Sequence, residues 1–171
     1  MGEVYKGFEP FFDADSRVLI LGSFPSVKSR EVGFYYGNKR NRFFEMLSRL
    51  FGEEIGEDVS RKKDFLKRHK IALYDTVSEC EIKGSSDGKI SRYRTADICY
   101  IFDGEFIRLS GAAAGGKPSP KIEKILLNGK KAYEIFMENY PGIPCVLMPS
   151  TSPANVSYDY EKWAVELSFL K

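Results

Sequence analysis

RVLILG, from Arg17 to Gly22, is a short run of leucine and β-branched residues that ends in glycine. A segment that is apolar at nearly every position is typical of a strand buried on both faces of a sheet. The segment IALYD, from Ile71 to Asp75, has the same pattern and ends in a polar residue. We therefore expect both segments to be strands inside a parallel sheet.

Helical patterns separate the predicted strands. Apolar residues recur at helical spacing after Asn41, at Phe43, Met46, Leu47 and Leu50. This spacing predicts an amphipathic helix over residues 41–51. Similar patterns predict a helix at 61–69, a strand, turn and helix over 121–140, a strand at 143–150 and a final helix around 160–170. Strands that alternate with helices favour an α/β fold, a three-layer α/β/α sandwich around a four-stranded, mostly parallel sheet.

The rest of the chain contains fewer recognisable elements. With 171 residues and 43% hydrophobic content, the chain can bury one sizeable core but scarcely two. We therefore expect a single domain over residues 1–171. Residues 80–95 are predicted to be a polar loop and residues 109–120 a flexible insert, whereas residues 98–109 favour no particular element.

Charge and cysteine content indicate where the protein works. The net charge is only +2, so no global electrostatic field argues for nucleic acid as a partner, and any basic surface must be local. The three cysteines are widely spaced, which suits reduced thiols in a cytosol better than a disulfide framework. The N-terminus lacks the apolar region of a signal peptide, and no segment approaches the ~20 apolar residues of a membrane span. We expect a cytoplasmic, intracellular protein that does not enter a membrane.

The loops that follow the predicted strands should meet at one edge of the sheet. Ligands of open parallel sheets bind beyond the carboxyl ends of the strands. The loops there are rich in Ser, Asn, Gly and Pro, which expose backbone and short polar groups. They comprise residues 22–41, 75–87, 128–130 and 149–155. We expect the functional site among them.

Several kinds of catalysis do not fit these loops. The sequence has no P-loop, no dinucleotide-binding fingerprint and no G-x-S-x-G motif around Ser23. The only histidine, His69, lies in a basic helical run away from the strand ends, which disfavours a Ser–His or Cys–His pair. Acidic residues are scattered, so we expect no metal and no cofactor. The loops offer amides, hydroxyls and aromatic rings instead.

Neutral donors can still catalyse a reaction whose leaving group departs as an anion. Hydrolysis of an N-glycosidic bond is such a reaction. An asparagine amide can donate to a carbonyl of the departing base while its oxygen holds the attacking water. One well-aimed donor contributes about a hundred- to a thousandfold in rate.

Five segments occur in a recognisable order: VLILGSFPS, FYYGNKRNRFF, IALYDTVSECEIKGSSD, LNGKKAYEIF and MPSTSPANVS. Together they resemble the uracil-DNA glycosylase superfamily, and within it the hypoxanthine-DNA (deoxyinosine) glycosylase branch. The likeness extends from about Gly7 to Trp163. It implies a monofunctional enzyme that flips a deaminated base out of DNA and leaves an abasic site. We expect a monomer whose partner is DNA containing such a base.

The resemblance implies a role for each matching residue. Asn41 matches the catalytic asparagine, and Tyr36 matches the aromatic residue that stacks on the flipped base. The other expected members of the base pocket are Gly22, Ser23, Phe24 and Pro25 at its floor, Asn128 in its wall, and Asp75. The loop that presses on the DNA backbone comprises Ser150, Thr151, Ser152, Pro153, Ala154 and Asn155. Given the small net charge, we expect few phosphate contacts, made by this loop and by Lys39, Arg40 and Arg42.

The same residues also have structural interpretations. Asn41 precedes an amphipathic helix and can be its N-cap, and Tyr36 can be a core aromatic residue. Asn128 and the glycine after it can form a strand-to-helix turn in which glycine supplies a positive φ. Asp75 can cap the loop after its strand, or it can orient the attacking water.

Three alternative functions stay open. A uracil or G/U-mismatch glycosylase would use the same carbonyl-reading amide. A catalytically idle DNA-binding module is possible because Asn38 and Lys39 stand where the family usually has His-Pro. A nucleotide hydrolase or transferase would act on free nucleosides and ignore duplex DNA.

Overall fold

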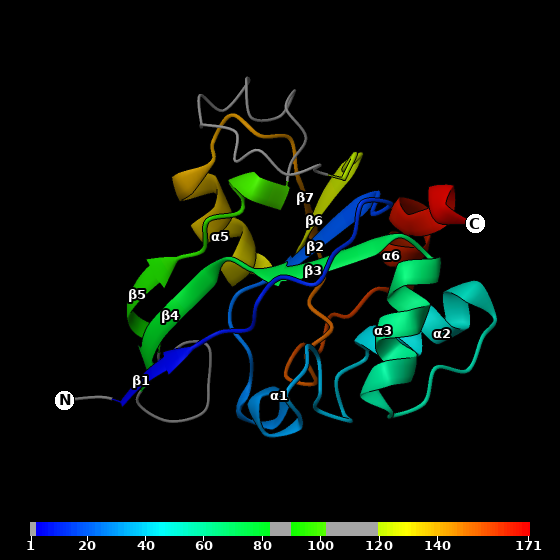
Figure 1. Ribbon diagram of the computed structural model, residues 1–171, viewed down its shortest axis with the longest axis horizontal. Helices are drawn as coiled ribbons and strands as arrows, with labels where there is room; N and C mark the ends of the chain where they lie inside the picture. Colours follow the sequence, from blue (N-terminus) through cyan, green and yellow to red (C-terminus); the bar gives the residue numbers. More distant parts are fainter. Residues whose placement is uncertain (1–2, 83–89, 102–119) are drawn as a thin grey trace.

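The computed structural model describes residues 3–82, 90–101 and 120–171 (Figure 1). Its central sheet has the strand order β3-β2-β6-β7, and each neighbouring pair is parallel. The strands are β2 (Val18–Gly22), β3 (Ile71–Asp75), β6 (Lys124–Asn128) and β7 (Val146–Met148). Every residue of β2 and β3 is buried, so both faces of these strands are covered. The predicted α/β class and the four-stranded parallel sheet are confirmed.

Helices alternate with strands along much of the chain, and the helix before β3 and the helix after β6 pack against the sheet (Figure 1). The helices are α1 (Val27–Val32), α2 (Phe43–Phe51), α3 (Val59–Arg68), α5 (Lys130–Asn139) and α6 (Tyr160–Leu167), with short 3-10 helices at Cys99–Ile101 and Ser168–Leu170. The apolar stripe of α2 is buried as its spacing predicts. None of the helices in the described ranges is both long and apolar enough to cross a membrane.

A second sheet corrects the prediction of a polar loop at residues 80–95. It is antiparallel, with the order β1-β4-β5, and comprises β1 (Glu3–Lys6), β4 (Val77–Ile82) and β5 (Ile90–Thr95). Only Val77 and Cys80 of β4 are buried, and the partly buried positions between them are polar. The strand therefore lacks the continuous apolar run that marks β2 and β3 in the sequence. Its stability depends on pairing with β1, which lies far away in the sequence. Residues 83–89 and nearly all of the predicted insert at 109–120 lie outside the described residues.

The strand order creates a switch point in the central sheet. Along the chain, β3 joins one side of β2 and β6 joins the other, so the order reverses between β2 and β6. Ligands of such sheets bind in the crevice at this point. Gly22 and Asn128 end the two strands, and Asp75 pairs in register with Gly22 on the next strand.

Candidate active site

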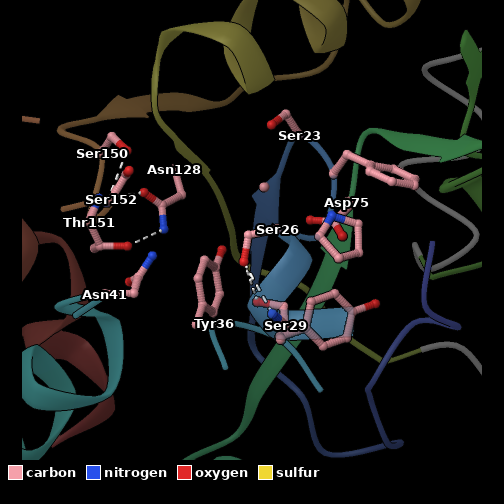
Figure 2. Close-up of a pocket in the computed structure, with 14 residues that line it drawn as sticks. Ser23, Ser26, Ser29, Tyr36, Asn41, Asp75, Asn128, Ser150, Thr151 and Ser152 are labelled. Atoms are coloured by element: carbon pink, nitrogen blue, oxygen red, sulfur yellow. Dashed lines mark hydrogen bonds between the residues drawn. The ribbon is translucent and has the colours of Figure 1, made fainter. Parts of the chain in front are cut away.

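A pocket lies at the carboxyl end of the central sheet (Figure 2). It encloses about 550 Å³, including space that is open to solvent. Its lining comprises Gly22, Ser23, Phe24, Pro25, Ser26, Ser29, Tyr35, Tyr36, Asn41, Asp75, Asn128, Ser150, Thr151 and Ser152. The structure therefore brings Asn41 together with every residue predicted for the base pocket, and with half of the predicted DNA-binding loop.

Asn41 lies directly before α2, and its side-chain amide is oriented by the start of that helix. The Oδ1 atom accepts a hydrogen bond from the backbone N–H of Phe43 at 2.9 Å. The N-cap position belongs to Arg42, whose side chain makes no capping bond, so Asn41 is not the N-cap but lies one residue before it and still accepts from the first helix N–H. Because the oxygen faces the helix, the amide nitrogen points toward Thr151 and Asn128 in the pocket (Figure 2). Asn41 thus accepts a hydrogen bond at the start of α2 and also offers its amide nitrogen as a donor in the pocket.

Tyr36 occupies the centre of the pocket in an uncommon backbone conformation. Its φ is 52°, in the left-handed region that few non-glycine residues adopt. One face of its ring stacks on Phe43, with centroids 4.0 Å apart and planes at 26°. The predicted stacking on a base would have to use the opposite face. Burial, and after it the charge of Asp75, raises the pKa of the Tyr36 hydroxyl well above its usual value of 10, so the hydroxyl stays protonated.

Gly22 allows two oxygen atoms to approach the end of β2. A Cβ atom built on Gly22 would lie 2.6 Å from Oδ1 of Asp75 and 3.4 Å from the hydroxyl oxygen of Tyr36. The first distance is shorter than any normal contact, so a side chain here would displace the carboxylate. Asp75 is only 5% exposed. The absence of a side chain at position 22 therefore leaves room for the Asp75 carboxylate at the pocket floor, whereas the Tyr36 hydroxyl would be at ordinary contact distance from a Cβ.

Asn128 connects the end of β6 to the loop at residues 150–155. Its Oδ1 accepts from the backbone N–H of Thr151 at 3.0 Å, and its Nδ2 donates to the Thr151 hydroxyl at 2.9 Å. Thr151 is fully buried and anchors the loop through these bonds, and its predicted contact with DNA stays a prediction. Gly129 has a φ of 102°, which confirms the predicted turn with a positive φ.

Arg42 makes several contacts within the protein, and its predicted phosphate contact stays a prediction. Its Nη2 donates to the backbone carbonyls of Ser152 at 2.7 Å and Asn155 at 2.6 Å. Its guanidinium lies over the ring of Tyr158, 4.4 Å from the centroid. Its backbone N–H donates to the carbonyl of Thr151 at 3.0 Å. Arg42 therefore holds the 150–155 loop against the start of α2.

The other predicted DNA-binding residues lie at the surface near the pocket. Lys39, Arg40, Pro153 and Ala154 are exposed, whereas Ser150, Ser152 and Asn155 are partly buried. The loop is held by its own bonds, including Asn155 Nδ2 donating to the carbonyl of Ser150 at 2.9 Å. Val156, the next residue, is 97% exposed and was not singled out from the sequence. An internally hydrogen-bonded loop with an exposed tip therefore borders the pocket.

Ser26 and Ser29 line the pocket and were missed in the sequence. Ser26 caps α1, and its hydroxyl donates to that of Ser29 at 3.1 Å. The Ser29 hydroxyl accepts from the backbone N–H of Gly37 at 3.0 Å, which ties the segment carrying Tyr36 to α1. The signal was present, since a serine before and a glycine after a six-residue stretch can mark the two ends of a short helix.

Comparisons with known proteins agree with this architecture. The family model described as "Uracil DNA glycosylase superfamily" matches residues 9–169. A hypoxanthine DNA glycosylase of Methanosarcina acetivorans is 32% identical over 155 residues, 89% of either chain. A hypoxanthine DNA glycosylase of Methanosarcina barkeri is 29% identical over 153 residues, covering 88% of this chain and 87% of the relative.

A solved structure shares the whole fold. It is a solution NMR structure from Methanosarcina acetivorans, described as that of a candidate uracil DNA glycosylase. It superposes with a TM-score of 0.75 at 29% sequence identity and covers 98% of this chain and 99% of its own. With the family match over nearly the full length, the fold and the position of the pocket, the chain belongs to the uracil DNA glycosylase superfamily.

Proposed function

We propose that the base removed by this DNA glycosylase is hypoxanthine, and that the enzyme hydrolyses the N-glycosidic bond of deoxyinosine in DNA and leaves an abasic site. Two relatives that match most of the chain are named hypoxanthine DNA glycosylases. Deamination of adenine produces this base. Extruding it from the duplex costs a few kcal/mol, and the pocket recovers that energy through contacts with the flipped base.

The observation that carries the proposal is the orientation of the Asn41 amide. The bond from Phe43 N–H to Oδ1 directs Nδ2 into the pocket. There the amide can donate to a base as negative charge develops on it. The N-terminus of α2 begins two residues later, and its partial positive charge favours the same anion. A donor of this kind contributes about a hundred- to a thousandfold in rate.

The second lone pair of Oδ1 is the place for the attacking water in this scheme. A carbonyl oxygen can accept two hydrogen bonds, and one is used by Phe43. The amide would then serve the leaving group through its nitrogen and the nucleophile through its oxygen. Because both atoms belong to one planar group, the helix start that fixes one also fixes the other.

We also propose that the enzyme is monofunctional. Among the described residues that line the pocket there is no lysine, so the lining provides no amine for a Schiff base with the sugar. The described residues also contain no group of three His, Cys, Asp or Glu placed to hold a metal ion. The chemistry proposed here uses an amide, and we expect it to need no cofactor.

The test is a base-release assay on duplexes that contain a single deoxyinosine, deoxyxanthosine or deoxyuridine. We expect release of free hypoxanthine to be fastest and to leave an abasic site. A borohydride trap should capture no enzyme–DNA adduct.

Other outcomes would support the alternatives. Preferential release of uracil would indicate a uracil or mismatch glycosylase. Tight binding without release of any base would indicate an idle DNA-binding module, and activity limited to free nucleosides would indicate a nucleotide hydrolase or transferase.

A further inference from the structure

A second hollow adjoins the pocket described above. It encloses about 510 Å³, including space that is open to solvent, and its lining comes from residues 36–48 and 55–62. These ranges include parts of α2 and α3, which lie side by side (Figure 1). Asn41 and Tyr36 line both hollows, so they form the wall between them. We call the second hollow the side pocket.

Lys62, on α3, lines the side pocket and carries a buried charge. The residue is only 4% exposed, although lysine is one of the residues least often buried. Its Nζ atom lies 4.8 Å from the ring centroid of Phe44 and 3.7 Å from Oε2 of Glu57. The second distance is too long for a hydrogen bond, and Nζ has no closer acceptor among the described residues. An ammonium group has three N–H donors, and their burial without acceptors costs free energy.

Glu57 is a weak partner for this charge. Its side chain is 62% exposed, so water competes for its carboxylate, and ion pairs at the surface contribute little to stability. Lys62 therefore places an incompletely paired ammonium group in the lining of a hollow that is open to solvent. An anion that enters the side pocket would supply the missing acceptors.

The substrate of a DNA glycosylase carries an anion to this position. In the proposed function, Asn41 lies beside the glycosidic bond that is broken, and the sugar on that bond is joined to a phosphate on each side. Because Asn41 is also a wall of the side pocket, a phosphate of the extruded nucleotide approaches the side pocket when the base occupies the neighbouring one. The unesterified oxygens of such a phosphate accept strong hydrogen bonds from cationic donors.

We propose that the ammonium group of Lys62 binds a phosphate next to the extruded nucleotide, and that Glu57 occupies the place of this phosphate in the free protein. Lys39 also lines the side pocket and is exposed, so it offers a second cation. Glu45 lines it as well, but its charge is exposed and therefore screened more strongly than that of Lys62. The assignment rests on the proposed function for the position of the sugar, and it is independent of which base is removed.

The proposal predicts opposite effects for the two members of the ion pair. Binding is measured with duplexes that contain a 2′-fluoroarabino analogue of deoxyinosine, which resists cleavage. Lys62→Met keeps an apolar chain and removes the charge. We expect it to weaken binding by about tenfold and to lower the slope of log affinity against log salt by about 1. Glu57→Gln removes the competing carboxylate, and we expect it to strengthen binding by about threefold.

Matched variants change exposed charges on the same elements. Lys67→Met removes a charge from the exposed surface of α3, and Glu54→Gln removes a carboxylate from the connection between α2 and α3. Both should bind within about twofold of the wild type, because exposed charges away from the contact are screened. Melting temperatures establish that each variant is folded. If Lys62→Met does not fold, Glu57→Gln still decides the matter, because a carboxylate that only stabilises the fold would not compete with DNA.

Neutral phosphates identify the contact. A methylphosphonate carries a methyl group in place of the charged oxygen, and it can be placed on the 5′ or the 3′ side of the analogue. We expect one of these substitutions to weaken binding by the wild-type protein about tenfold and to affect binding by Lys62→Met less than about twofold. Such non-additivity would show that the side chain and the phosphate interact directly.

Three results would overturn the proposal. The first is equal affinity of Lys62→Met and Lys67→Met. The second is unchanged or weaker binding by Glu57→Gln, which would mean that the ion pair only supports the fold. The third is that each methylphosphonate has the same effect on the wild type and on Lys62→Met.

An abasic analogue in place of the inosine analogue separates this proposal from the proposed function. Because the contact is with the backbone, the effects of Lys62→Met and Glu57→Gln on affinity should persist in the abasic duplex, and their loss there would overturn the backbone contact. Failure to release hypoxanthine from ordinary deoxyinosine would instead overturn the proposed function.

Discussion

The backbone N–H of Phe43 donates to Oδ1 of Asn41 at 2.9 Å, and this bond sets the direction of the Asn41 amide nitrogen. The bond needs only an acceptor at position 41, whereas the proposed chemistry needs a donor. The two requirements fall on different atoms of one side chain. A substitution that keeps the oxygen and removes the nitrogen therefore distinguishes them.

Asn41→Asp should retain the fold and lose the activity. The carboxylate still accepts from Phe43, and its charge suits a helix N-terminus, so the melting temperature should stay the same or rise slightly. The rate of hypoxanthine excision in single-turnover experiments should fall by about a hundredfold or more, because the donor is gone and the new charge repels the departing anion.

Asn38→Asp is the matched control for this variant. Asn38 Oδ1 accepts from the backbone N–H of Arg40 at 3.0 Å, so it also serves as a loop acceptor, and the change adds the same charge nearby. Its excision rate should stay close to that of the wild type. If the excision rate of Asn41→Asp matched that of Asn38→Asp, the role of Asn41 would be limited to stabilising the start of α2.

Arg42→Gln should destabilise the protein, whereas Arg40→Gln should not. The first change removes the donor to the carbonyls of Ser152 and Asn155, and a hydrogen bond from a charged group contributes about 1.5–3 kcal/mol. The second change affects an exposed side chain and should alter the free energy of unfolding by about 0.5 kcal/mol or less. Urea denaturation of both variants measures the difference. Equal stability of the two would show that the Arg42 contacts do not hold the loop.

The affinity for DNA should depend only modestly on salt. Phosphate contacts are expected from the exposed cations Lys39 and Arg40 and from loop hydroxyl and N–H groups, since Arg42 is engaged inside the protein. Removing Lys39 or Arg40 should lower the slope of log affinity against log salt by about 1 each. A wild-type slope that corresponds to about eight or more neutralised phosphates would contradict this small footprint.

Gly22→Ala should impair excision more than stability. The new Cβ would lie 2.6 Å from Oδ1 of Asp75, so the carboxylate must move. Such overpacking costs about 1–3 kcal/mol, and a shift of about 1 Å in a binding group can reduce the rate about a hundredfold. Gly142→Ala, where a Cβ would meet nothing within 4 Å, is the control. Excision by Gly22→Ala at the Gly142→Ala rate would show that the position of Asp75 is unimportant.

Removal of metal ions should leave the activity unchanged. The proposed catalysis uses the Asn41 amide, so dialysis against EDTA, followed by single-turnover excision in buffer free of divalent ions, should give the untreated rate. A loss of activity that is restored by one added divalent cation would require a different mechanism.

The central sheet could be predicted because its strands are buried on both faces, which leaves continuous apolar runs such as Val18–Leu21 in the sequence. The second sheet could not. Most of β4 is only partly buried, its pairing with β5 is irregular, and its other partner, β1, lies more than seventy residues away. No local pattern reports such a pairing.

Most of the residues that line the pocket could also be predicted from the sequence. Loops at the carboxyl ends of parallel strands must converge, and the family motifs lie on those loops, so the residues expected in the base pocket do meet. The contacts that Arg42 and Thr151 make within the protein could not be predicted. Both depend on which backbone groups lie opposite them in the folded protein, and an arginine beside a DNA-binding loop has the same sequence signature whether it contacts phosphate or a carbonyl.

The pocket also contains two asparagines that are chemically vulnerable, since asparagine deamidates when the next backbone nitrogen attacks its side-chain carbonyl. The nitrogen that follows Asn41 donates to the carbonyl of Thr151. The nitrogen that follows Asn128 belongs to glycine, the neighbour that permits this reaction most readily, yet it donates to the carbonyls of Leu127 and Met148. Both nucleophiles are thus held away from the carbonyls that they would attack. A protein that acts on bases that have lost ammonia thereby protects its own amides from the same loss.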